Sequence, residues 1–188
     1  HQGQDRKPQH EQAEQQHVQL LCFPELAITA YTCADLFFQQ QLLDEALRGL
    51  DRMVAASYNS ALISIVGMPL LVDNLLFNVA VVIQNGKMLA IVPKTFLPNN
   101  NEFYEKRWFA SATQSNKNAV SVNGVTVPFG TNILVGNKDF KFAIELCEDL
   151  WVPIPPSSQH SVQGADIIFN LSASNALIAR SEEHTSEL

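Results

Sequence analysis

Short apolar runs alternate with polar segments along most of this chain. Runs of about four to eight apolar residues, bounded by Gly, Pro or Asn, are typical of buried strands. We expect strands in the following segments: 18–23, 61–66, 76–83, 87–92, 133–135, 140–146 and 165–171. Asn85-Gly86 between two of these runs predicts a tight hairpin, and a second hairpin is expected near Val125–Phe129.

Two segments have the pattern of helices. Leucines and a valine recur at helical spacing between residues 43 and 54, with charged residues between them. Asp35 is expected to cap this helix, after a loop over residues 29–35. A short helix is predicted over residues 157–164, behind a proline-rich turn. Strands mixed with helices indicate an α/β layered fold.

The two ends of the chain differ from its middle. Residues 1–17 are polar and rich in glutamine, which predicts either a partial, solvated N-terminal helix or disorder. Residues 180–188 (RSEEHTSEL) have no apolar periodicity and look like the translation of a sequencing-library adapter. We interpret them as an artefact tail, the alternative being a natural acidic tail. The predicted domain therefore covers residues 18–179.

Composition narrows the classes of function. The 188 residues, 46% apolar and 16% charged, fit a soluble globular domain. The net charge of −7 argues against nucleic acid or an anionic membrane as the main partner, and no apolar run of about 18 residues is present. Three cysteines without framework spacing and no apolar leader predict reduced thiols in the cytoplasm. Histidines and cysteines lack ligand spacing, so no metal site is predicted.

Three predicted strand ends carry reactive side chains. Cys147 follows the run Phe140–Leu146 where a strand gives way to a loop, and Glu25 and Lys94 each follow an apolar run that ends in proline. A thiol needs a base or a cation to become a good nucleophile at neutral pH. A partly buried carboxylate is a suitable base, and a fixed ammonium can hold an oxyanion. We expect the three side chains to converge if these strands share a sheet.

Each of these residues also has an ordinary structural interpretation. A charged residue at a strand end is usually a solvated loop residue, and a cysteine in a strand is usually a small core residue. Cys22 is expected in the core, while Cys33, in the loop, is a weaker rival nucleophile. His160 is the one histidine near ordered sequence, and its predicted place on a surface helix gives little support to a Cys–His pair.

Four segments resemble the nitrilase, or carbon–nitrogen hydrolase, superfamily. They are FPELAITAYTCADLF (23–37), VPKTFLPNNNEFYEKRWF (92–109), ELCEDLWVPIPPS (145–157) and NLSASN (170–175). They are more closely similar to the glutaminase domains of glutamine-dependent NAD+ synthetases. The resemblance runs from about residue 15 to residue 179. It implies a nitrilase-like four-layer αββα sandwich, truncated here at both ends.

The resemblance also implies roles for single residues. It implies a catalytic triad of the general base Glu25, Lys94 and the nucleophile Cys147, with Glu102 as an additional glutamate beside the lysine. The positions that it implies for glutamine binding are Tyr31, Asn100, Glu148, Ser174 and Arg180. The chain departs from the family pattern at Ala30, where glycine is usual, and at Asn100, where an aromatic residue often stands.

The activity implied by the resemblance is glutamine hydrolysis. In the resembled enzymes the ammonia passes to a synthetase domain of the same chain, which uses ATP and Mg²⁺ to convert deamido-NAD+ to NAD+. Those cofactors are expected in that further domain and none in this one, and the full-length protein is expected to form a homo-oligomer. Two other functions stay open, a stand-alone amidase or carbamoylase and a non-catalytic interaction module. Apolar faces and strand edges left uncovered predict poor solubility for the chain by itself, and we expect the chain by itself to be inactive.

Overall fold

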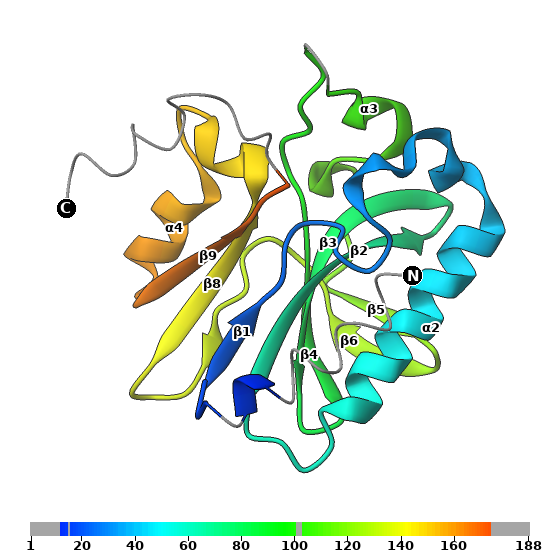
Figure 1. Ribbon diagram of the computed structural model, residues 1–188. Helices are drawn as coiled ribbons and strands as arrows, with labels where there is room; N and C mark the ends of the chain where they lie inside the picture. Colours follow the sequence, from blue (N-terminus) through cyan, green and yellow to red (C-terminus); the bar gives the residue numbers. More distant parts are fainter. Residues whose placement is uncertain (1–11, 15, 101–102, 174–188) are drawn as a thin grey trace.

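The chain folds into helices and sheets that pack face to face in layers (Figure 1). The computed structural model describes residues 12–14, 16–100 and 103–173. The strands are β1 (Leu20–Cys22), β2 (Ile63–Val72), β3 (Leu75–Gln84), β4 (Lys87–Pro93), β5 (Ala119–Val122), β6 (Val125–Pro128), β7 (Val135–Gly136), β8 (Lys141–Leu146) and β9 (Ile167–Leu171). The α-helices are α2 (Gln40–Ala56), α3 (Glu105–Trp108) and α4 (Pro156–Val162), and the 3₁₀ helices are η1 (Tyr31–Phe38), η2 (Ala112–Gln114) and η3 (Cys147–Trp151).

The first sheet has the strand order β1-β2-β3-β4. β1 runs parallel to β2, and the other neighbours are antiparallel. Two-residue turns, Asp73-Asn74 and Asn85-Gly86, join β2 to β3 and β3 to β4, and all four of these residues have positive φ. Tight hairpin turns of this kind favour Asn, Asp and Gly because both central residues need positive φ. The predicted Asn-Gly hairpin is therefore confirmed.

Two smaller sheets complete the strand arrangement. β5 and β6 pair around Asn123-Gly124, so the hairpin expected near Val125–Phe129 forms, although it begins six residues earlier, at Ala119. The third sheet has the order β7-β8-β9, in which β8 and β9 run parallel. A parallel pair needs a crossover connection, and the chain makes it through η3 and α4.

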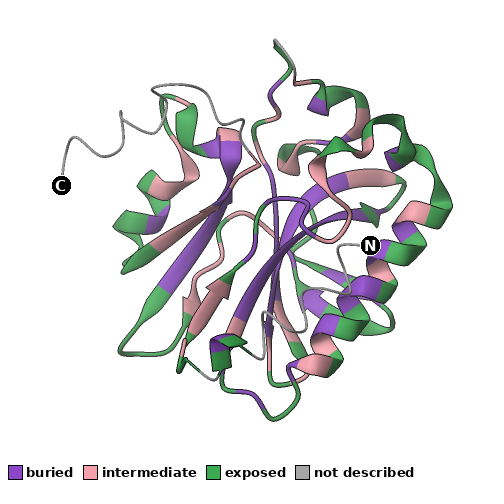
Figure 2. Ribbon diagram, in the orientation of Figure 1, coloured by how far each residue is buried: buried purple, intermediate pink, exposed green. Residues whose placement is uncertain are grey.

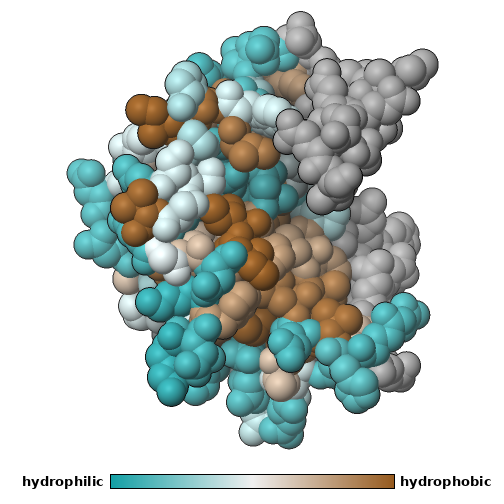
Figure 3. All heavy atoms as spheres, turned by 90° about the vertical axis from the view of Figure 1, so that its left-hand side faces the viewer, coloured by the Kyte–Doolittle hydropathy of each residue, from teal (hydrophilic) through white to brown (hydrophobic). Residues whose placement is uncertain are grey.

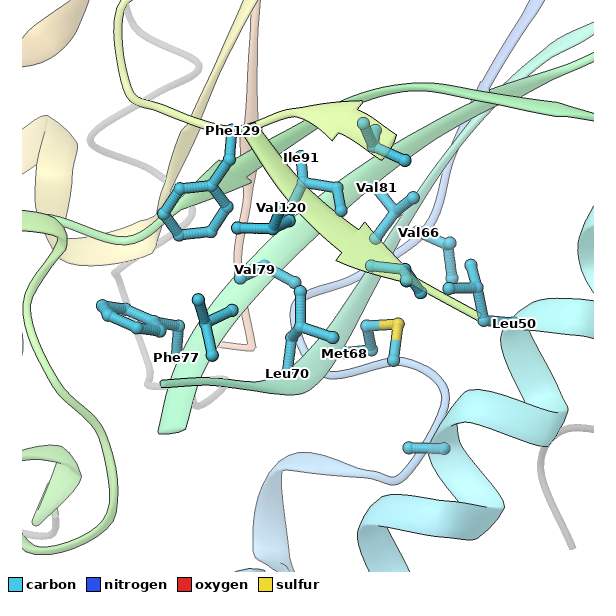
Figure 4. Packing of buried hydrophobic residues seen from close by; sticks show 14 of the residues in the cluster. Leu50, Val66, Met68, Leu70, Phe77, Val79, Val81, Ile91, Val120 and Phe129 are labelled. Atoms are coloured by element: carbon cyan, nitrogen blue, oxygen red, sulfur yellow. The ribbon is translucent and has the colours of Figure 1, made fainter. Parts of the chain in front are cut away.

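Side chains of the first sheet point alternately into two apolar layers, as successive residues of a strand do. On one face Met68 and Val79 pack with Leu50 of α2 and Val120 of the β5–β6 hairpin (Figure 4). α2 packs against β2 and β3 on this face.

The opposite face of the first sheet packs against the third sheet. Val82 and Val92 share this second apolar layer with Phe142 and Ile144 of β8. α4 covers the outer side of β8, so the layers run helix, sheet, sheet, helix. The central strands β2, β3 and β8 are largely buried, the edge strands β1, β7 and β9 are mostly half-buried or exposed, and α2 exposes its outward face (Figure 2). The predicted αββα sandwich is confirmed.

Four local predictions were wrong. Most of the expected loop, residues 31–35, is part of η1, and Asp35 does not cap α2, whose N-cap is Gln39. Cys22 is exposed because β1 is an edge strand. His160 is 1% exposed on the inner side of α4, where its Nε2 lies 2.8 Å from the carbonyl oxygen of Thr131.

The side of the molecule that carries α4 and β9 is rich in exposed apolar atoms (Figure 3). β9 is an edge strand of the third sheet, and its Ile167 is 45% exposed. Apolar residues at the rim of the layer between the sheets, among them Leu20, Ile63 and Val135, are only partly buried. An open apolar edge of this kind is a site where strands of other molecules can pair.

Candidate active site

Lys94 is the centre of a buried polar cluster at one end of the layer between the first and third sheets. Its Nζ lies 2.7 Å from Oε1 of Glu25 and 2.7 Å from Oε1 of Glu105, and its side chain is fully buried. Burial by itself would lower the pKa of Lys94. The negative charges of Glu25, Glu105 and Cys147 outweigh that effect, so the pKa lies above its ordinary value. The lysine is therefore a fixed cation.

Strand alternation explains why polar residues are found in this layer. Asn78 and Lys94 have the same parity as Ala80, Val82 and Val92, which face the third sheet. Asn78 is completely buried on β3, and its Nδ2 donates a hydrogen bond of 2.7 Å to Oε1 of Glu25. The backbone N–H of Lys94 donates to the carbonyl oxygen of Asn78 at 2.9 Å. The two strands thus fix the base and the cation relative to each other.

The loop that carries Glu25 lies directly against β2. A Cβ atom at Gly67 would come within 2.5 Å of the backbone nitrogen of Leu26 and 2.7 Å of the carbonyl oxygen of Pro24. Glycine is therefore required at this close approach. The other carboxylate oxygen of Glu25, Oε2, accepts a hydrogen bond of 3.2 Å from the backbone N–H of Ala173. Glu25 is thus oriented from both sides.

Glu105, at the start of α3, links Lys94 to Tyr31. The Tyr31 hydroxyl donates a hydrogen bond of 2.7 Å to Oε1 of Glu105. Burial, and next the negative charge of Glu105, raise the pKa of Tyr31, so the hydroxyl keeps its proton. Burial also raises the pKa of Glu105 above its ordinary value, although the charge of Lys94 acts against this rise.

An exposed ion pair holds η1, which carries Tyr31, onto α3. Arg107 binds Asp35 through two hydrogen bonds of 2.7 and 2.8 Å, and Nε1 of Trp108 donates to the same carboxylate at 2.9 Å. Hydrogen bonds from Arg107 and then from Trp108 lower the pKa of Asp35. Asp35 is therefore not a helix cap. It contributes to the site by holding η1 against α3.

Cys147 stands at the point where β8 ends and η3 begins. It is 7% exposed, and its φ of 44° lies in the left-handed region, which is strained for a residue with a side chain. Nδ2 of Asn170 donates to its carbonyl oxygen at 3.3 Å. The backbone N–H of Leu146, directly before Cys147, and those of Thr95 and Phe96, directly after Lys94, donate to one carboxylate, that of Asp149, which brings Cys147 to this cluster.

The structure brings Glu25, Lys94 and Cys147 to one site, but not through a shared sheet. Glu25 and Lys94 belong to the first sheet and its loops, whereas Cys147 ends a strand of the third sheet. We expected the three side chains to converge if their strands shared one sheet. That condition was wrong, because the three groups meet across the interface between two sheets.

The positions implied for glutamine binding have different surroundings. Tyr31 is at the cluster, and Asn100 is exposed at a bend. Glu148 is half-buried and lines a pocket of about 580 Å³ together with Thr95, Phe96 and Val152. Three further predicted residues lie outside the described residues: Glu102, Ser174 and Arg180.

Sequence reasoning missed three residues of the cluster, Asn78, Glu105 and Asp149. Glu105 lies in the same motif as Glu102, three residues later, and nothing in the sequence favours one over the other. Asn78 is a polar residue inside an apolar strand run, which is a signal that was available. Asp149 lies in the Cys-Glu-Asp segment, where it looks like an ordinary loop charge.

Among the described residues there is no group of three or more His, Cys, Asp and Glu side chains placed to hold a metal ion. In the same residues, no helix is both long and apolar enough to cross a membrane. Cys33 lies in η1, and its thiol is 3.5 Å from the carbonyl oxygen of Thr29.

Comparison with known proteins identifies the class of protein that this fold and site define. The family model of carbon-nitrogen hydrolases matches residues 9–186. The chain belongs to the carbon-nitrogen hydrolase family. Among curated relatives, the glutamine-dependent NAD(+) synthetase of Mycobacterium tuberculosis is 37% identical over 167 residues, which cover 87% of this chain and 24% of that protein. The human protein of the same name is 31% identical over 166 residues, which cover 84% of this chain and 23% of that protein.

Solved structures of other proteins have the same fold. A glutamine-dependent NAD(+) synthetase from Cytophaga hutchinsonii superposes with a TM-score of 0.85 at 28% identity, covering 97% of this chain and 29% of that one. An amidase from Nesterenkonia sp. has a TM-score of 0.71 at 16% identity, covering 96% of this chain and 62% of that one, and shares the fold. The chain spans about a quarter of the length of the curated relatives that it matches.

Proposed function

We propose that this chain is the glutaminase part of a glutamine-dependent NAD+ synthetase, which hydrolyses the side-chain amide of glutamine to glutamate and ammonia. The observation that carries the proposal is Lys94, a buried ammonium held between Glu25 and Glu105 beside Cys147. A base, a fixed cation and a thiol are the groups that amide hydrolysis through a covalent intermediate requires.

In the first step the thiol proton of Cys147 passes to Glu25, and the sulfur attacks the amide carbon of glutamine. The oxyanion that forms is held by the ammonium of Lys94 and the backbone N–H of Glu148. Loss of one such donor typically costs about 3–4 kcal/mol of barrier. The carbon–nitrogen bond then breaks, and the proton on Glu25 goes to the leaving nitrogen. Ammonia leaves, and a γ-glutamyl thioester remains on Cys147.

In the second step Glu25 takes a proton from water, and the resulting hydroxide attacks the thioester carbon. The carbon–sulfur bond breaks, glutamate leaves, and the proton returns to the sulfur of Cys147. Glu25 thus acts as a base toward the thiol and the water, and as an acid toward the leaving nitrogen and sulfur. The hydrogen bonds that it accepts from Asn78 and Ala173 prepare this role by fixing both of its oxygens.

The polar groups around the cluster suit glutamine as the substrate. Oε2 of Glu105 is buried and accepts no hydrogen bond from the described residues, so it can accept one from the amide nitrogen of the substrate. Glu148 provides a negative charge in the neighbouring pocket for the α-ammonium group. Asn100, Ser174 and Arg180 remain sequence-based candidates for further contacts.

The proposal extends to the longer protein. A synthetase domain in the same chain would bind ATP, Mg²⁺ and deamido-NAD+ and use the ammonia released here, in a cytoplasmic homo-oligomer. The curated relatives described above, at 37% and 31% identity, are synthetases, which favours this branch over a stand-alone amidase. The presence of all three triad residues in one cluster favours an enzyme over a non-catalytic module.

Cys147→Ala in the full-length synthetase is the direct test. We expect it to abolish NAD+ formation from glutamine and leave NAD+ formation from added ammonia unchanged, because only the thioester step requires the thiol. Cys33→Ala is the matched control and should retain both activities. Continued use of glutamine by the Cys147→Ala protein would refute the nucleophile assignment.

A further inference from the structure

Asp149 is a buried carboxylate that accepts hydrogen bonds from three backbone N–H groups. It is 2% exposed. Its Oδ1 accepts from Phe96 at 2.7 Å and from Thr95 at 3.1 Å, and its Oδ2 accepts from Leu146 at 3.1 Å. Charge-assisted hydrogen bonds to backbone N–H groups are stronger than those between neutral groups.

These three amides flank two residues of the proposed triad. Thr95 and Phe96 directly follow Lys94, and Leu146 directly precedes Cys147. Lys94 follows a strand of the first sheet and Cys147 follows a strand of the third, and these two strands are not neighbours in any backbone ladder. One side chain therefore joins the two chain segments on which the cation and the thiol stand.

We infer that Asp149 is a positioning residue for the hydrolysis, a carboxylate clamp that sets the distance between Lys94 and Cys147. This inference rests on the proposed function. Because Cys147 begins η3 with a left-handed φ of 44°, its sulfur depends on what holds the chain on both sides. Asp149 accepts a hydrogen bond from Leu146, the residue before Cys147, and Asn170 donates one to the carbonyl oxygen of Cys147.

The clamp requires an acceptor on both sides, which a carboxylate has and an amide lacks. In Asp149→Asn one oxygen can still serve either Thr95 and Phe96 or Leu146, but the amide nitrogen then faces the N–H donors on the other side. Burial raises the pKa of Asp149 to about 6, although the backbone N–H groups and Lys94 lower it in part. The carboxylate is therefore largely ionised at neutral pH and fit to accept from both sides.

The test compares Asp149→Asn with Asp166→Asn in the full-length synthetase. Asp166 makes the same kind of bond, its Oδ2 accepting from the backbone N–H of Lys141 at 2.8 Å, but at the opposite end of β8. We expect Asp149→Asn to lower kcat for glutamine about 10- to 100-fold, the scale of a misplacement of about 1 Å. KM should stay within about threefold, and activity with ammonia should be unchanged. Asp166→Asn should behave like the wild type.

A second readout does not depend on glutamine. The rate at which iodoacetamide alkylates Cys147, measured by mass spectrometry of its peptide with Cys33 as the internal reference, should fall in Asp149→Asn. The sulfur then lies farther from the ammonium of Lys94, which favours the reactive, ionised form of a thiol. If Asp149→Asn does not give folded protein, Asp149→Ser, which retains one acceptor oxygen, takes its place with the same expectations.

The outcomes separate the inference from the proposed function. Wild-type kcat and a wild-type alkylation rate in the Asp149 variant would overturn the clamp while leaving glutamine hydrolysis in place. If the wild type itself does not hydrolyse glutamine, the proposed function fails, and the alkylation rate alone decides on the clamp. A slower rate then supports it, and an equal rate overturns it.

Discussion

Lys94 is a fully buried ammonium, and the site is built around the need to balance its charge. Transfer of a single ion into a protein interior costs several kcal/mol unless partners compensate for it. Glu25 and Glu105 do so at 2.7 Å each, and Asn78 and Tyr31 bind those carboxylates in turn. The charged groups that the proposed reaction requires are therefore also the groups that keep one another in place.

Ala30, directly before Tyr31, adopts a backbone conformation that suits glycine. Its φ of 98° and ψ of 153° lie in a region that residues with a Cβ atom rarely occupy. Glycine is usual at this position in the family that the sequence resembles, so the alanine found here adds backbone strain. Residues held in such regions cost of order 1–3 kcal/mol.

Ala30→Gly should stabilise the folded chain because it removes this strain. We expect a gain of about 1 kcal/mol, or about 2–4 °C in Tm for a domain of this size, measured by circular dichroism melting. Ala46→Gly, in the middle of α2, is the control and should lower Tm, since glycine costs about 1 kcal/mol inside a helix. A lower Tm for Ala30→Gly would contradict the strain argument.

Single residues also show where sequence reasoning reaches its limit. Glu25, Lys94 and Cys147 were found because each directly follows an apolar run, which places it at a strand end. The choice between Glu102 and Glu105 depends on the path of the chain after Lys94. Glu105 begins α3, and its backbone N–H donates to the carbonyl oxygen of Pro98. No sequence pattern predicts the chain turn that this hydrogen bond closes.

Among the elements, those with a regular period were predicted and those without one were not. α2 and most strands follow from helical spacing and apolar runs, with ends that moved by up to three residues. β2 is the exception, because it continues to Val72, six residues beyond its predicted end. η1 was missed because it is an irregular 3₁₀ segment with non-helical φ and ψ at Thr32 and Ala34. It is held by tertiary contacts, among them the hydrogen bonds that Arg107 and Trp108 donate to Asp35.

β9 is the element that should control how the isolated chain behaves in solution. Ile167, 45% exposed on this edge strand, should promote pairing between molecules, and a lysine there should block it. We expect Ile167→Lys to reduce light scattering by the isolated chain. Ile154→Lys, at a residue that is 75% exposed between η3 and α4 and belongs to no strand, is the matched control and should change it little. An equal effect of both substitutions would show that added charge, and not the edge, is responsible.

At the scale of the whole molecule, the site exists only because two sheets pack face to face. The order of the layers could be predicted from the alternation of strands and helices along the sequence and from the family resemblance. The sequence does not show which strands share a sheet, so it does not show that Lys94 and Cys147 come from different ones. That arrangement makes the contacts between the sheets, including those of Asp149, part of the active-site geometry.

The most direct measurement of the central claim is to trap the covalent intermediate. The full-length synthetase would be mixed with glutamine, quenched in acid during turnover and digested, and its peptides analysed by mass spectrometry. We predict a γ-glutamyl group on the peptide that contains Cys147 and its absence from the Cys147→Ala protein. A γ-glutamyl group on Cys33 or on any residue other than Cys147 would contradict the account.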